Sequence, residues 1–213
     1  MPVACHKKTI VFVHIPKTAG SSLRHGILRA KPAHTILFDY RADSKATTKA
    51  YVERFSTPEG RGSIAAEFIQ TPLFLCGHFR AKKYTPHFPL AHFATFFRNP
   101  VERVLSHFNH RLRRGFEITL DEFIETPDFQ NLQAKYLEGV NWSQFGFIGL
   151  TENYKSSLKR FREFSGIQVK ELKRNVQARK FAPPPSRVIA RIEVLNEADM
   201  KLYESVKAYL SSQ

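Results

Sequence analysis

Five short apolar runs punctuate the chain, and amphipathic or polar stretches separate them. The first run, Ile10–Val13, is β-branched and aromatic without polar alternation, the pattern of a strand covered on both faces. The other four expected strands are residues 33–39, 72–76, 91–97 and 145–150. Because helical stretches separate them, the sequence predicts a three-layer α/β domain with a mainly parallel central sheet flanked by helices.

Apolar positions spaced 3.6 residues apart predict the helices between these strands. The expected helices are residues 23–30, 44–55, 63–70, 100–114, 119–125, 128–137 and 151–164, with a final helix after residue 196. The residues expected to cap them are Ser21 or Ser22, Thr119 in a capping box with Glu122, Thr151, Asn196, and Gly166 at a C-terminus. Residues 57–60 are expected to form a turn.

The helix from Pro100 is predicted to have two different faces. Asn99 is its expected cap, and its apolar side chains are Val101, Val104, Leu105, Phe108 and Leu112. Asn99, Arg103, Ser106 and His110 recur on the other side. We expect that polar face either to meet solvent or to line a ligand cleft.

The segment after the first strand, His-Ile-Pro-Lys-Thr-Ala-Gly-Ser-Ser, has the composition of an anion-binding loop. Its small residues let the backbone approach a ligand, and the helix that follows offers unpaired N–H groups to phosphate or sulfate. Lys17 would supply a point charge. The order differs from a Walker A loop, because Lys17 precedes Gly20 and no glycine lies upstream of it.

Composition narrows the partners without choosing among them. The 213 residues, 42% of them hydrophobic, suffice for one globular domain, which we expect to span residues 1–213. A net charge of +14 implies an anionic partner: nucleic acid, a membrane surface, a polyanionic glycan or a phosphorylated nucleotide. Cys5 and Cys76 are too few for a disulfide framework and have no metal-binding spacing.

The sequence contains no apolar run of about 18 residues, and residues 1–8 lack the apolar centre of a signal peptide. We therefore expect an unanchored protein in a reducing compartment, the cytoplasm of a bacterium.

Two motifs together resemble one enzyme family. The loop at residues 14–22 resembles the 5′-phosphosulfate loop of sulfotransferases that use 3′-phosphoadenosine 5′-phosphosulfate (PAPS). Phe97-Arg98-Asn99-Pro100 with Ser106 looks like the 3′-phosphate-binding element of the same family. Both motifs stand in the expected order at strand-to-helix junctions, so the joint match is more specific than either half.

Further segments are similar to carbohydrate sulfotransferases of the group that contains heparan sulfate 2-O-sulfotransferase and its bacterial relatives. These are Gly77-His78, residues 131–137 and residues 148–152. Departures from the family are Cys76, where the 2-O enzymes carry a histidine, Asn99, where many relatives have Asp, and the absent Lys-Gly-x-x-Gly loop of small-molecule sulfotransferases.

The resemblance implies a P-loop-like form of the α/β domain, and it implies roles for individual residues. His78 would be the base that takes the proton of an acceptor hydroxyl, and Lys17 would neutralise charge on the leaving group. The implied cofactor-binding residues are Lys17, Thr18, Ala19, Gly20, Ser21 and Ser22 at the 5′ end and Arg98 and Ser106 at the 3′-phosphate. The co-substrate would be PAPS with no metal, and the acceptor a glycan or small molecule.

Alternatives remain open from the residues alone. His14 competes with His78 as the base, although a structural histidine is the favoured interpretation of it. A nucleotide-dependent kinase would suit a basic loop but lacks Walker spacing and an Mg²⁺-binding Asp at a strand end. The basic stretch 170–180 suggests a nucleic-acid-binding module, although no helix-turn-helix, zinc-finger or RNP signature accompanies it.

Overall fold

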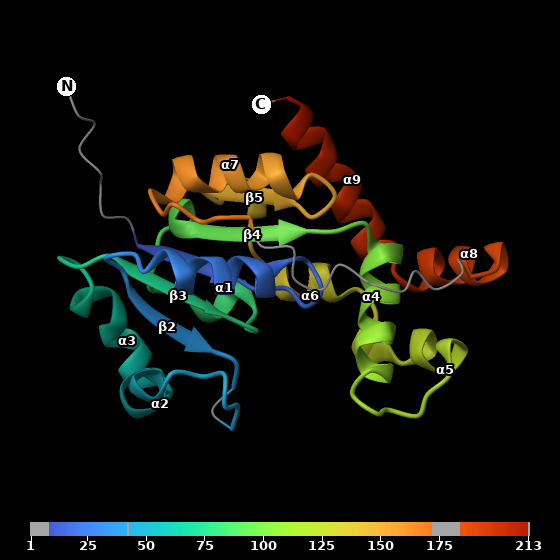
Figure 1. Cartoon of the computed structure of the whole chain (residues 1–213), viewed down its shortest axis with the longest axis horizontal. Coiled ribbons are helices and arrows are strands. Elements are labelled where there is room, and N and C mark those ends of the chain that lie inside the picture. Colours follow the sequence, from blue (N-terminus) through green and yellow to red (C-terminus); the bar gives the residue numbers. More distant parts are fainter. Residues whose placement is uncertain (1–8, 42, 172–183, 213) are drawn as a thin grey trace.

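A parallel sheet of five strands is the frame of the computed structural model, which describes residues 9–41, 43–171 and 184–212 (Figure 1). The strands are β1 (Ile10–Val13), β2 (Thr35–Asp39), β3 (Leu73–Gly77), β4 (Phe93–Phe97) and β5 (Phe147–Leu150). Their order is β2-β3-β1-β4-β5, and each neighbouring pair is parallel. The three-layer α/β prediction is confirmed.

β1 occupies the centre of the sheet because it has no polar face to expose. All four of its residues are buried, and Val11 is paired with Leu75 of β3 on one side and Phe93 of β4 on the other. The strand order changes direction at β1, and in open α/β sheets the crevice beyond the carboxyl ends of the strands at such a point is where ligands bind.

The described residues also form nine α-helices. They are α1 (Gly20–Ala30), α2 (Lys49–Phe55), α3 (Pro58–Glu67), α4 (Pro100–Leu112), α5 (Leu120–Glu125), α6 (Leu132–Leu137), α7 (Tyr154–Ser165), α8 (Ser186–Leu195) and α9 (Glu197–Ser211). α1 and α7 pack on one face of the sheet, and α2, α3, α6 and α9 pack on the other. α4, α5 and α8 form a third apolar cluster, gathered at one end of the molecule beyond the arrowhead of β4 (Figure 1).

Several helix starts differ from their predictions. Residues 57–60 are not a separate turn, because the Thr57 hydroxyl accepts the N–H of Gly60 and caps α3, with Pro58 at its first position. Thr151 does not cap α7: its N–H and its hydroxyl both donate to the Phe97 carbonyl, which extends the sheet by one residue. α7 therefore begins at Tyr154, three residues later than predicted.

The predicted helix at 128–137 is split in two. Asn131 has a φ of 50°, which separates a 3₁₀ turn at Pro127–Phe129 from α6. The predicted helix at 44–55 is shorter, since α2 starts at Lys49, and α8 was not predicted at all. The capping box of Thr119 and Glu122 and the left-handed Gly166 after α7 are confirmed.

Asn196 occupies the N-cap position of α9 without making the expected side-chain cap. Its side-chain amide instead donates to Ile192, and its side-chain oxygen accepts the N–H of Asn131. Cys5 and residues 172–180 of the basic stretch lie outside the described residues.

Candidate functional site

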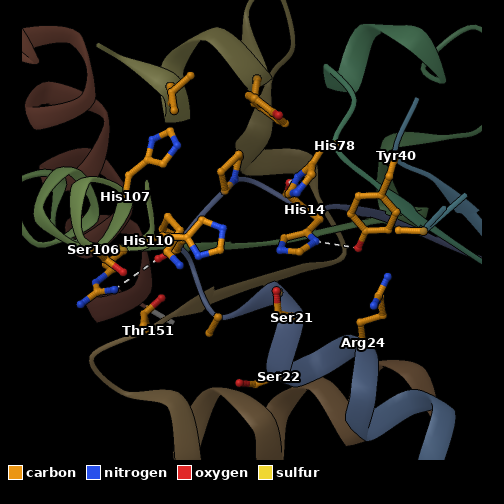
Figure 2. A pocket seen from close by; sticks show the side chains of 18 of the residues that line it. His14, Ser21, Ser22, Arg24, Tyr40, His78, Ser106, His107, His110 and Thr151 are labelled. Carbon is orange, nitrogen blue, oxygen red and sulfur yellow. Dashed lines mark hydrogen bonds between the residues drawn. The ribbon is translucent and has the colours of Figure 1, made fainter. Parts of the chain in front are cut away.

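A cleft of about 1130 Å³ opens beyond the carboxyl ends of the strands (Figure 2). The predicted site residues that line it are Lys17, Ala19, Gly20, Ser21, Ser22, His78, Arg98 and Ser106. They come from the segments after β1, β3 and β4 and from α4, so the sheet brings four distant parts of the chain together. Thr18 is the exception: its side chain is buried, and its hydroxyl donates to the Ile15 carbonyl at 2.9 Å.

The loop between β1 and α1 exposes main-chain donors to the cleft. Neither Ser21 nor Ser22 caps α1 as predicted; the helix starts at Gly20, after Ala19 in the left-handed conformation with a φ of 67°. The N–H groups of Ser22 and Leu23 return to the Ala19 carbonyl. Those of Gly20 and Ser21 have no acceptor among the described residues, so they remain available to an anion.

Gly20 is required by close packing of this loop. A Cβ at position 20 would lie 2.0 Å from Cδ2 of the buried His14 ring. The side-chain-free backbone therefore allows the first turn of α1 to lie directly against His14.

Lys17 lies among cations. Burial, together with nearby Arg113 and Arg98, lowers its pKa to about 8. An arrangement that brings like charges together in this way is costly without a counter-ion, and a multiply charged anion in the cleft would relieve it.

Arg98 joins the two predicted anion-binding motifs. Its Nη1 donates to the Lys17 carbonyl at 3.4 Å, and its Nη2 donates to Glu102 at 3.3 Å. The turn after β4 therefore touches the loop after β1, and the two motifs open into one space.

α4 only partly follows the predicted division of faces. Ser106 and His110 line the cleft, in agreement with the interpretation that this polar face borders a ligand site, and Figure 2 shows them close together. Arg103 was wrongly placed on that face: it is fully buried and ion-paired with Asp199 of α9, with 3.7 Å between Nε and Oδ2. A helix inside the protein is covered on more than one side, so Arg103 meets α9 instead of solvent.

His78 is held with one ring nitrogen free for chemistry. Its Nδ1 lies 2.6 Å from the His14 carbonyl oxygen, and since a carbonyl only accepts, Nδ1 carries the proton. Nε2 is then the unprotonated nitrogen. His78 keeps solvent access within the cleft, but the atoms around it lower its pKa by desolvation. The neutral ring that a proton acceptor needs is therefore the stable form at pH 7.

His14 has the contacts of a structural residue. It is 4% exposed, its Nδ1 lies 2.7 Å from the Tyr40 hydroxyl, and burial holds its pKa well below the ordinary value. Tyr40 also contacts Sγ of Cys76 at 3.4 Å, and burial raises the pKa of that thiol to about 12. Cys76 is therefore a protonated side chain, buried against Tyr40.

Sequence reasoning missed several residues that line the cleft. Arg24 lies over the rings of Phe38 and Tyr40 at 5.2 and 5.3 Å, and Arg111 and Arg114 extend the cationic lining along and beyond α4. The signal for Arg114 was available, because it follows Ser106 and His110 at steps of four residues. Tyr40 directly follows a strand, at the edge where α/β sheets bind ligands.

The described part of the chain has neither a metal-binding cluster nor a membrane-spanning helix. It holds no group of three or more His, Cys, Asp or Glu side chains placed to bind a metal ion. Among the same residues, no helix has both the length and the apolar character needed to cross a bilayer.

No protein-family model and no curated protein matches the chain. Among solved structures, it is similar to mouse sulfotransferase SULT7A1 complexed with PAP, with 16% identity, a TM-score of 0.49 and coverage of 92% of this chain. The alignment spans 66% of the mouse protein.

Proposed function

We propose that this protein is a sulfotransferase that moves a sulfuryl group from PAPS to an acceptor hydroxyl. The observation that carries the proposal is the meeting of three features in one cleft: the open amides of Gly20 and Ser21, the cations Lys17 and Arg98, and the free Nε2 of His78. The first two suit a nucleotide with phosphates at both ends. The third suits proton removal from a hydroxyl.

The residues fit the co-substrate by charge and by hydrogen-bond capacity. Lys17 and the open amides of Gly20 and Ser21 would bind the 5′-phosphosulfate, and Arg98 with Ser106 would bind the 3′-phosphate. The surrounding cations Arg111, Arg113 and Arg114 add to a positive field that favours a multiply charged nucleotide.

The proposed reaction is an in-line displacement at sulfur. The acceptor oxygen forms a bond to sulfur while the bond from sulfur to the bridging oxygen of the 5′-phosphate breaks. Nε2 of His78 takes the proton of the acceptor, and the electron pair of the broken bond leaves with 3′,5′-bisphosphoadenosine. Lys17 and the loop amides would stabilise the charge that grows on the leaving oxygen.

A carbohydrate is the acceptor class that the sequence resemblance favours, and we include it in the proposal. The lining of the cleft is compatible with a sugar, because hydroxyl-rich ligands are bound by hydrogen-bonding and aromatic side chains together. Tyr40, Ser44 and His78 supply such groups within the cleft.

Calorimetric titration tests the proposal against its alternatives. The wild-type protein is titrated with 3′,5′-bisphosphoadenosine, ATP and a short DNA duplex at two salt concentrations. We expect the bisphosphate to bind much more tightly than ATP and DNA at both. Binding of ATP as tight as that of the bisphosphate would favour a kinase, and submicromolar, salt-sensitive DNA binding would favour a nucleic-acid-binding protein.

A further inference from the structure

Gln133 makes a two-point contact with the backbone of Arg98. It is fully buried at the start of α6, far from Arg98 in sequence. The Arg98 N–H donates to its Oε1 and its Nε2 donates to the Arg98 carbonyl, both at 2.9 Å. The amide thus satisfies both main-chain groups of Arg98 at the first residue beyond β4, much as a neighbouring strand would.

The Arg98 side chain depends on this support because its own contacts are weak. Its guanidinium bonds are 3.3 and 3.4 Å long, and the partner carboxylate of Glu102 is 59% exposed. Exposed ion pairs of this kind contribute little to fixing a side chain. The position of the guanidinium therefore follows from where the main chain of residue 98 is held.

Gln133 is itself fixed by the C-terminal helix. The Asp199 carboxylate accepts the N–H of Gln133 at 3.2 Å and that of Ala134 at 2.8 Å. Asp199 is fully buried against Arg103, and its own N–H donates to Asn131. Hydrogen bonds therefore run without interruption from α9 through α6 to the turn at Arg98.

We propose that Gln133 is a positioning residue for the nucleotide site: it holds Arg98 in the orientation that receives the 3′-phosphate, and α9 supports it through Asp199. The inference rests on the proposed function, because it assigns the 3′-phosphate to Arg98. It adds that a side chain outside the cleft sets the selectivity for a 3′-phosphorylated nucleotide.

The test compares Gln133→Met with the matched variant Gln130→Met. Met has nearly the volume of Gln but makes no such hydrogen bonds, and Gln130 donates to Ile124 instead of Arg98. The readout is the ratio of affinities for 3′,5′-bisphosphoadenosine and adenosine 5′-phosphate, with thermal unfolding recorded in parallel. We expect Gln133→Met to lower this ratio by about tenfold or more, since misplacement of a charged donor weakens its bond, and Gln130→Met to leave it unchanged.

A purely structural role for Gln133 would give a different result. Gln133→Met would then lower the unfolding temperature while the affinity ratio stays at its wild-type value, and that outcome overturns the inference. If the Met variant does not fold, Gln133→Glu replaces it: this keeps an acceptor for the Arg98 N–H and loses the donor to the Arg98 carbonyl. The same fall in the ratio is expected.

A measurement on the wild-type protein also tests the role of Gln133. Solvent exchange of the Gln133 side-chain N–H₂ protons, followed by NMR, should slow more with the bisphosphate than with adenosine 5′-phosphate. Equal slowing overturns the inference. If the wild-type protein binds both nucleotides equally well, the proposed function fails; if it discriminates and Gln133→Met discriminates equally, the inference alone fails.

Discussion

Replacement of Gly20 by alanine should disrupt the loop that we propose binds the anion. The added Cβ would lie 2.0 Å from His14 Cδ2 and 2.4 Å from Nε2, whereas an ordinary contact starts near 3.4 Å. About 1.4 Å of movement is therefore required. The His14 ring is buried and bonded to Tyr40, so the first turn of α1 must move and carry the amides of Gly20 and Ser21 with it. We expect bisphosphate affinity to fall about 10- to 100-fold and the free energy of unfolding to fall by about 1–3 kcal/mol.

The control for this variant is Gly62→Ala. Gly62 is exposed within α3, and a Cβ there would meet no atom within 4 Å. Alanine should stabilise the protein by about 0.5–1 kcal/mol and leave binding unchanged. Calorimetry and urea unfolding of both variants are the assays. Wild-type bisphosphate affinity in Gly20→Ala would refute the view that these amides bind the ligand.

Three further predictions concern titrating side chains. His78→Ala should lower the rate of sulfuryl transfer about 10²- to 10⁴-fold with bisphosphate binding retained. Because burial lowers the pKa of His78, the rate of the wild type should fall only below pH 6.5. A midpoint of the pH–rate profile above that value would contradict the assignment. Bisphosphate affinity should decline above pH 8 as Lys17 loses its proton, and Lys17→Arg should remove that decline. His107 has a pKa near 3 in its buried site, so the unfolded chain takes up its proton first as the pH falls below 6.5. The free energy of unfolding should therefore drop by up to about 1.4 kcal/mol per pH unit. In His107→Gln, urea unfolding at each pH should show a smaller fall of this free energy as the pH is lowered.

The sequence was sufficient to predict the five strands and eight of the residues that line the cleft, because both depend on local patterns. An apolar run such as Ile10–Val13, which has no polar face, is stable only where both faces are buried, as in a strand between two other strands. The small residues after it and the lysine at position 17 are local signals that predict an anion-binding loop, whatever the fold around them. Parallel pairing of the strands then brings their carboxyl ends to the same edge of the sheet.

Interactions between distant segments could not be predicted from local sequence patterns. Arg103 follows the spacing of a polar helix face, and only the packing of α9 makes it a buried partner of Asp199. The sequence position of Asp199, in the first turn of α9, indicates only a charge that favours the helix start, whereas its carboxylate accepts main-chain N–H groups of α6. Gln133 lies in a segment that the family resemblance singled out, but its contact with Arg98 joins residues 35 positions apart.

The most direct test of the central claim is the effect of Arg98→Ala on the binding of 3′,5′-bisphosphoadenosine and adenosine 5′-phosphate. Arg187→Ala, which removes an exposed arginine on α8, is the matched control. If Arg98 binds the 3′-phosphate, its loss should weaken the bisphosphate by about 10- to 100-fold, as for a charged hydrogen bond, with little change for the monophosphate. Equal weakening of both nucleotides, or none, would contradict the assignment of this cleft to PAPS.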